Sequence, residues 1–255
     1  MSITLIIQIV AFFILGLSCS YIGNISDKEF TDRSLKQGIG GSLIRVHMIM
    51  TRALKVSLES SQSLATRNAN HALDHQGFII YLKCLSSIMY SHHLSEDDVA
   101  FPYFHSFLQK APFDSLTDEH IEMAYYMHKL DKWIKKDELS ELKQKDFEEV
   151  SSYLSKIYEL WVPHIMIEQD CLSPGNISSI IEQEENIRLE KEFLEYSKMH
   201  QDGLGNLVIP FMLYNLEKPE REIMALDFPW MKRNIIVPIF ARKKWKPMEP
   251  FLLAS

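Results

Sequence analysis

Glycine and alternating β-type runs are scarce in this sequence. The chain of 255 residues contains 9 glycines, and few of its stretches alternate β-branched and polar residues, which disfavours a fold based on sheets. Hydrophobic residues make up 46% of the chain and charged residues 24%, which is enough to bury one substantial core. We therefore expect an all-α protein.

Cysteine and positive charge are also in short supply. The three cysteines, Cys19, Cys84 and Cys171, lack the spacing of a metal finger and are too few for a disulfide framework. The formal net charge is −7, which disfavours nucleic acid as a bulk electrostatic partner. Neither a zinc finger nor a nucleic-acid-binding function is therefore expected.

Charge is absent altogether from the start of the chain. No charged side chain occurs between Ser2 and Ser26, and Ile3–Ile22 is just long enough to cross a bilayer, which takes about 20 apolar residues. This segment is either a membrane anchor or export signal, or a hydrophobic first helix that packs on the domain. We expect the former, which makes the protein membrane-associated or exported, whereas the latter would leave it cytoplasmic.

Apolar residues at helical spacing predict four amphipathic helices within residues 38–175. The breaker GIGGSL (38–43) precedes the first helix, Pro102 breaks the chain after the second, and Thr117 is the expected N-cap of the third. Pro163 in the fourth has no N–H to donate and should kink or restart that helix. We take residues 38–175 as a four-helix bundle.

Three further segments complete the predicted domain organisation. Residues 1–26 are the hydrophobic signal or anchor segment, and residues 176–202 form an additional, highly charged fifth helix with a solvated outer face. Residues 203–255 form an irregular, basic-aromatic C-terminal extension. Its composition suits either an anionic membrane surface or a cap that packs on the bundle, and its prolines favour the cap.

One pattern of histidine and carboxylate occurs twice in the four helices. LIRVHMIM at 43–50 matches LTDEHIEM at 116–123, and HHLSEDDVAFP at 92–102 matches HIMIEQDCLSP at 164–174. Both copies of the second element read His-x3-Glu-x-Asp-x3-Pro. The two histidines of a half are separated by 45 residues (47 to 92) or by 44 residues (120 to 164). Each half therefore offers one His from its first helix and a His/Glu pair from its second.

The repeated residues predict a metal site in the helical core. Spacing of i, i+4 places each His/Glu pair on one helix face, and antiparallel helices bring both pairs into a common core. Without a cation, buried carboxylates would be strongly destabilising or would need protons. Imidazole and carboxylate donors without thiolate suit iron, manganese or zinc, and both glutamates can bridge two ions. The candidate ligands are His47, His92, Glu96, His120, His164 and Glu168.

Two neighbouring residues are reserve candidates. His93 lies about 100° around the helix from His92, where it would contact a ligand or face solvent rather than bind the ion. Glu119 precedes His120 and is more typical of a helix start than of a seventh donor. The sequence singles out no catalytic residue.

These motifs resemble the hemerythrin-like (HHE cation-binding) domain over about residues 40–175, chiefly through the twin His-x3-Glu motif followed by Pro. The resemblance implies an up-and-down four-helix bundle around a non-haem di-iron centre. It also implies a protein that binds or senses dioxygen, reactive oxygen or nitrogen species, or iron. Oxygen-carrying hemerythrins place a second His four residues after the third-helix His, where this chain has Ala124. Simple oxygen transport is therefore not implied.

Two other functions remain open. A di-iron oxidase or peroxide-decomposing oxidoreductase would use the same ligands but needs a path for its substrate. A membrane-tethered interaction protein would keep the bundle around a vestigial metal site. We favour a metal- or oxygen-binding protein over an enzyme, with two iron ions, or manganese or zinc in their place, and with dioxygen or a related small ligand as the partner.

Overall fold

All regular structure in the described part of the chain is helical. The structure is a computed structural model that describes residues 38–66, 75–137, 144–201 and 204–253. Within these ranges there are helices and connecting turns but no strand. The prediction of an all-α protein is therefore confirmed.

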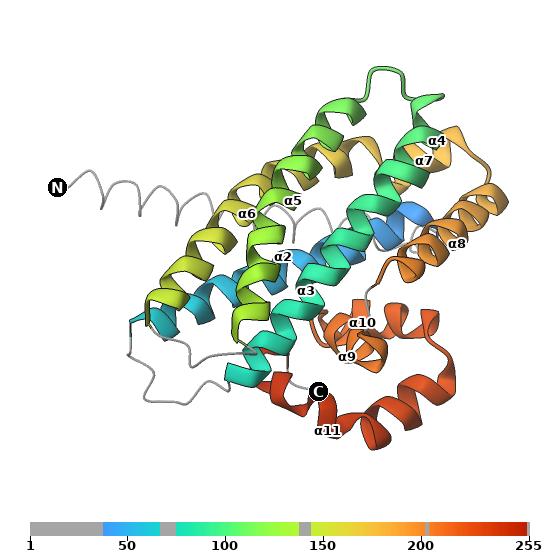
Figure 1. Ribbon diagram of the computed structural model, residues 1–255. Coiled ribbons are helices and arrows are strands. Elements are labelled where there is room, and N and C mark those ends of the chain that lie inside the picture. The colour runs from blue at the N-terminus through green and yellow to red at the C-terminus, as the bar shows by residue number, and fades with distance from the viewer. Residues whose placement is uncertain (1–37, 67–74, 138–143, 202–203, 254–255) are drawn as a thin grey trace.

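Four long helices carry most of the core. They are α2 (Ile39–Ala65), α3 (His75–Ser95), α5 (Phe113–Asp137) and α6 (Gln144–Cys171). α2 packs against α3 and α6, and α5 packs against the same two helices (Figure 1). Each helix therefore has two long neighbours, and the buried faces of all four meet along a shared interior.

Three helix boundaries differ from the sequence prediction. The chain does not break at Pro102, because α3 continues through a π-helical turn (Glu96–Ala100) into α4 (Phe101–His105), where Pro102 occupies the first turn. Proline is tolerated in the first turn of a helix because the N–H that it lacks would have no partner within that helix. α5 begins at Phe113, so Thr117 is not its N-cap. α6 continues through Pro163 and does not restart.

The predicted fifth helix is two helices. α7 (Pro174–Ile180) begins after Ser173, whose hydroxyl oxygen accepts a hydrogen bond from the backbone N–H of Asn176. The backbone is extended at Ile181 and Glu182, and α8 (Gln183–Met199) follows. Proline at the first helical position and serine at the cap are typical of a helix start. The segment SPGN (173–176) therefore follows the end of α6 and begins a new helix.

The start of α2 is held by α8. The helix begins inside the predicted breaker, directly after Gly38, whose φ is 93°. The backbone N–H of Gly38 donates to Glu190 Oε2 over 3.0 Å, and that of Ile39 donates to Asn186 Oδ1 over 2.9 Å. The first N–H groups of a helix have no partner within it, so side chains of α8 supply the acceptors. The charged helix is therefore solvated on one face only, and its other face packs on α2 and α3.

The C-terminal extension is a series of short helices rather than an irregular segment. They are η3 (Gly205–Leu207), α9 (Val208–Leu213), α10 (Lys218–Met224), η4 (Ala225–Asp227), η5 (Lys232–Phe240), α11 (Arg242–Trp245) and η6 (Lys246–Phe251). α9 and η6 pack against α3. The ring of Phe251 contacts those of Phe78 and Tyr81, with centroids 5.7 and 5.6 Å away. The apolar side of the extension thus covers the end of the long helices, as the cap interpretation predicts.

The N-terminal hydrophobic segment, residues 1–26, lies outside the described residues. Among the helices that are described, none has an apolar stretch long enough to cross a bilayer. The prediction of a membrane anchor or export signal therefore stays a prediction.

Candidate metal centre

The four long helices bring all six predicted ligands into one buried cluster. α2 carries His47, α3 carries His92, and Glu96 begins the π-helical turn that follows it. α5 carries His120, while α6 carries His164 and Glu168. Each of the six side chains is at most 3% exposed. Residues far apart in the sequence therefore meet in the interior, as the repeat predicts.

The four imidazoles form two pairs. His47 Nε2 lies 3.0 Å from His92 Nε2, and His120 Nε2 lies 3.0 Å from His164 Nε2. Each pair joins the two histidines of one sequence repeat. Two nitrogens that bind one ion at about 2.1 Å and at right angles are ~3.0 Å apart. Each pair therefore has the separation expected of two donors to a shared ion.

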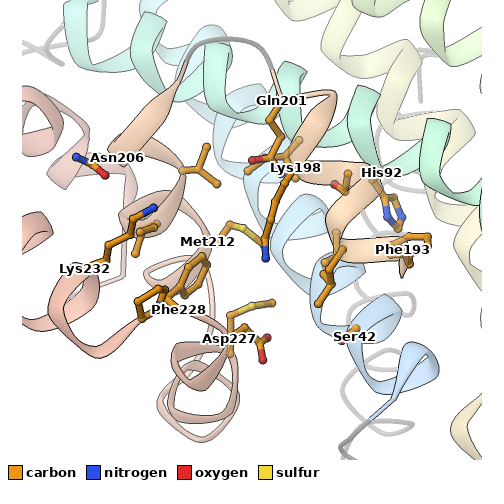
Figure 2. Close-up of a pocket in the computed structure, with 18 of the residues that line it drawn as sticks. Ser42, His92, Phe193, Lys198, Gln201, Asn206, Met212, Asp227, Phe228 and Lys232 are labelled. Carbon is orange, nitrogen blue, oxygen red and sulfur yellow. The ribbon is translucent and has the colours of Figure 1, made fainter. Parts of the chain in front are cut away.

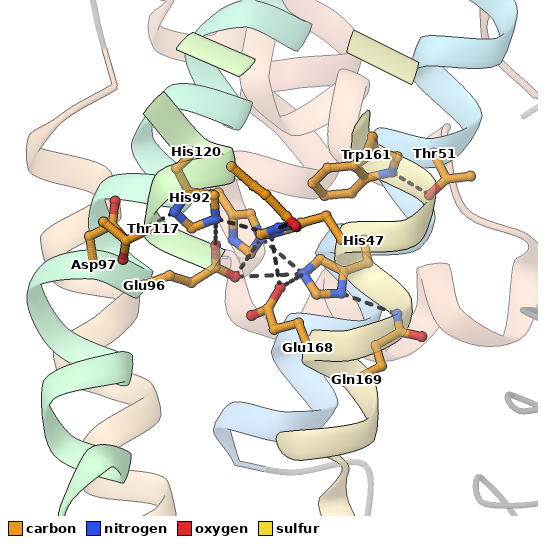
Figure 3. A network of polar contacts seen from close by, with 12 residues as sticks. His47, Thr51, His92, Glu96, Asp97, Thr117, His120, Trp161, Glu168 and Gln169 are labelled. Atoms are coloured by element: carbon orange, nitrogen blue, oxygen red, sulfur yellow. Dashed lines mark hydrogen bonds and ion pairs between the residues drawn. The ribbon is translucent and has the colours of Figure 1, made fainter. Parts of the chain in front are cut away.

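The two glutamates connect the imidazole pairs (Figure 3). Glu96 Oε1 lies 2.8 Å from His92 Nε2, and Glu96 Oε2 lies 3.5 Å from His120 Nε2. Glu168 Oε2 lies 3.4 Å from His47 Nε2 and 3.6 Å from His164 Nε2. Each carboxylate thus faces both pairs, which is the placement a bridging carboxylate needs.

Burial without a cation makes the cluster electrostatically unfavourable. None of the four carboxylate oxygens of Glu96 and Glu168 accepts a well-aligned hydrogen bond from the described residues. Desolvation raises the pKa of Glu96 to about 8. Desolvation, together with repulsion from Glu96, raises the pKa of Glu168 well above its usual range. A buried carboxylate is stable when ionised only if it is paired or binds a metal, so a cation between these groups fits the donors present.

Burial also favours the neutral form, which is the form that binds metals, of three of these histidines. Desolvation lowers the pKa of His47 and of His92 well below the usual value, and it lowers the pKa of His164 to about 2. Repulsion from neighbouring imidazoles acts in the same direction. The centre therefore offers neutral nitrogen donors and carboxylates that need a positive charge.

Outer hydrogen bonds orient three of the four imidazoles. His120 Nδ1 lies 3.0 Å from Asp97 Oδ1, which also accepts a hydrogen bond of 2.6 Å from the Thr117 hydroxyl. His164 Nδ1 lies 2.9 Å from Glu119 Oε2. An imidazole that binds a metal through Nε2 carries its proton on Nδ1, and a carboxylate acceptor fixes that tautomer. Both carboxylates therefore orient an Nε2 atom toward the centre.

His47 has an amide as its partner. The side-chain amide nitrogen Nε2 of Gln169 lies 3.1 Å from His47 Nδ1, and rotation of the amide by 180° presents its oxygen to an Nδ1–H instead. On the opposite side, the ring of Trp161 meets that of His47 edge-on, with centroids 5.4 Å apart. Trp161 is itself held by a hydrogen bond of 2.8 Å from its Nε1 to Thr51 Oγ1. These contacts fix the ring of His47 from both sides.

His93 is buried against the centre. Its side chain is 6% exposed, so the solvent-facing alternative is wrong. The ring stacks on His120, with centroids 4.0 Å apart and 11° between the planes. His93, Glu96, His120 and His164 together have donor atoms close enough to hold one ion. An imidazole lone pair lies in the plane of its ring, however, and parallel stacked rings cannot both direct lone pairs at one ion. The stack therefore favours contact with a ligand over direct binding, as expected of a reserve residue.

Asp97 and Gln169 are the residues that the sequence interpretation missed. Each directly follows a predicted glutamate ligand, Glu96 or Glu168, and each contacts an imidazole of the other half of the repeat. The two residues occupy matching positions of the repeat, and this match is the feature of the sequence that could have identified them. The partner of each lies across the helix interface, which spacing along a single helix does not reveal.

One family of known proteins is similar to this chain. The model of the hemerythrin HHE cation binding domain matches residues 43–174, which is just over half of the chain. The matched region contains all six predicted ligands. No curated protein and no solved structure matches the chain closely enough to count as similar.

Proposed function

Since the chain belongs to the hemerythrin HHE cation-binding family, we propose that it is a di-metal protein, with iron as the metal, that binds or senses dioxygen, a reactive oxygen or nitrogen species, or iron itself. In this proposal α2, α3, α5 and α6 form the up-and-down bundle of the family, and residues 38–175 are the cation-binding domain. One observation carries the proposal. The four imidazoles form two pairs with 3.0 Å between the Nε2 atoms of each, and two buried carboxylates connect the pairs.

The assignment of ligands follows the repeat. His47 and His92 would hold one ion, and His120 and His164 would hold the second. Glu96 and Glu168 would bridge the ions, because a carboxylate has two oxygens whereas a neutral imidazole offers one lone pair. Six protein donors leave positions open for a small ligand, unlike the four-donor sites of structural zinc. Two iron ions in such a site would supply electrons to an oxidising ligand.

The residues around the pairs favour a sensor or binder over an oxygen carrier. α5 has Ala124 where oxygen-carrying hemerythrins have a further histidine, so the donor set is sparser. The protein's own groups hold the site rather than take part in chemistry: Asp97 and Glu119 fix the imidazole tautomers, and Trp161 excludes water from one side of His47.

Metal content of the full chain, purified without oxygen, tests the proposal. We expect two iron ions per chain and an optical spectrum that changes when air is admitted. Glu168→Gln and His92→Ala should each lose at least one ion, because each removes a donor from the centre. His105→Ala, on an exposed residue of α4, is the matched control and should keep both ions. A protein that takes up neither iron nor manganese, and whose stability is unchanged by a chelator, would contradict the proposal.

A further inference from the structure

The two halves of the repeat differ at one outer hydrogen bond. In the second half, Glu119 lies one residue before His120 and accepts the Nδ1–H of His164. The matching position of the first half, one residue before His47, is Val46. A valine accepts no hydrogen bond, and His92 Nδ1 has no hydrogen-bond partner among the described residues although its side chain is only 2% exposed. Among the four candidate histidine ligands, His92 is therefore the one whose Nδ1 lacks a described hydrogen-bond partner.

A cavity lies at this position. Its volume is about 360 Å³, and its lining includes both His92 and Val46. Figure 2 shows His92 and Phe193 at one end of the lining and Asn206 and Lys232 at the other. The cavity is walled by the bundle on one side and by α8 and the C-terminal extension on the other. Cavities of this size are typical of small-molecule sites.

The lining has an apolar body and a few polar groups. Phe193, Met212 and Met224 are each at most 8% exposed and form part of the apolar wall. Lys198 extends across the cavity toward Asp227 (Figure 2). Among the described lining residues there are two lysines, Lys198 and Lys232, and one acidic residue, Asp227. This combination suits a molecule with an apolar body and a negatively charged head.

We propose that the cavity binds a small amphipathic carboxylic acid, whose carboxylate accepts the Nδ1–H of His92 and so takes the place that Glu119 has in the other half. Lys198 supplies a compensating positive charge, and the apolar wall contacts the body of the ligand. An outer carboxylate fixes the tautomer of a metal-binding histidine and strengthens it as a donor. Occupancy of the cavity therefore changes the metal centre. This second consequence rests on the proposed function, whereas binding of the acid does not.

Binding is tested first on the metal-free full chain by calorimetry with three probes of equal length: decanoate, decanol and decylamine. We expect one decanoate per chain and weaker binding of the other two. Lys198→Glu should weaken decanoate binding by about fivefold, the upper end of the effect of one exposed ion pair. Lys191→Glu, on the same helix and outside the lining, is the matched control and should leave binding unchanged. Equal binding of decylamine, or no decanoate binding, overturns the proposal.

Val46→Glu tests the position of the head group. The new carboxylate would accept the His92 proton from within the chain, so decanoate binding should fall by tenfold or more, while Glu119→Gln should leave it unchanged. A Val46→Glu protein that folds and binds decanoate as tightly as the original chain overturns the proposed pose. If Val46→Glu does not fold, the Lys198→Glu comparison decides alone.

The metal-loaded protein separates the two proposals. Decanoate should slow the loss of iron to a chelator in the original chain but not in Lys198→Glu. Decanoate binding to a chain that takes up no metal refutes the proposed function and supports the cavity site. Iron uptake without decanoate binding refutes the cavity site and supports the proposed function.

Discussion

Removal of metal should give the protein an unusual dependence of stability on pH. In the metal-free fold, Glu96 has a pKa of about 8 and Glu168 has one well above 4.5, because both are desolvated. The folded state therefore binds protons at these groups that the unfolded state, with a glutamate pKa near 4.5, has released. Stability from this source is fully present below pH 4.5 and is lost as the pH rises toward the folded pKa values.

The buried histidines act in the opposite direction at lower pH. Burial lowers the pKa of four imidazoles, His47, His92, His93 and His164. The unfolded state protonates them below pH 6.5 while the folded state does not, so their contribution is present above pH 6.5 and is lost as the pH falls. Below pH 6.5 the free energy of unfolding therefore changes more through the four imidazoles than through the two carboxyls. The metal-free protein should therefore be most stable near pH 6.5.

The magnitude above the maximum follows from the two carboxyls. One proton changes the free energy of unfolding by about 1.4 kcal/mol per pH unit, so two give about 3 kcal/mol per unit. The unfolded-state histidines are still half protonated at pH 6.5 and offset part of this slope, so the net loss between pH 6.5 and about 8 should reach about 2 kcal/mol, a substantial part of the ~5–15 kcal/mol that stabilises a typical domain. Bound metal keeps both carboxylates ionised in the fold, so the loss should disappear in the loaded protein.

Urea denaturation across pH 4.5 to 8.5, with chelator and with metal, measures this dependence. The double variant Glu96→Gln/Glu168→Gln is the control, because it removes both titrating groups while keeping their shape, and its stability should not fall above pH 6.5. A metal-free original chain whose stability is flat or rises between pH 6.5 and 8 would refute the electrostatic reasoning.

Three other predictions concern the surroundings of the centre. Asp97→Asn should weaken metal affinity by about 10–100-fold, because it removes the anionic acceptor of His120, whereas Asn at the exposed Asp98 should not; competition with a chelator measures both. Phe251→Ala should lower the free energy of unfolding by about 3–5 kcal/mol, while Phe240→Ala, at a side chain that is 75% exposed, should change it by less than about 0.5 kcal/mol in urea denaturation. Asn186→Ala should cost about 1 kcal/mol, because it removes an acceptor from the start of α2.

The clustering of the candidate ligands could be predicted from the sequence, because the pattern that carries it is local and repeated. A His/Glu pair at i, i+4 shares a helix face whatever the rest of the chain does. A second copy at nearly the same spacing indicates a second helix pair with the same geometry. These two facts placed His92 with Glu96 and His164 with Glu168, and the structure brings all four together.

Helix boundaries and the contacts between helices were harder to predict from the sequence. Thr117 and Pro102 have the local character of helix ends, yet tertiary packing extends helix past both. The asparagine and glutamate that cap α2 come from α8, 147 and 152 residues after the groups that they cap. Local propensity describes only nearby residues, so a cap supplied by another helix has no signature in the segment it stabilises.

The sequence by itself determined the helical class, the two repeated halves and the six candidate ligands, because each depends on residue type and on spacing within one helix. Only the tertiary structure decided which imidazole each outer partner orients, that His93 is buried against His120, and that a cavity reaches His92 where Val46 replaces an acid. Those features depend on the rotation of each helix about its axis and on the path of the C-terminal extension. Both are set by the packing of the whole core.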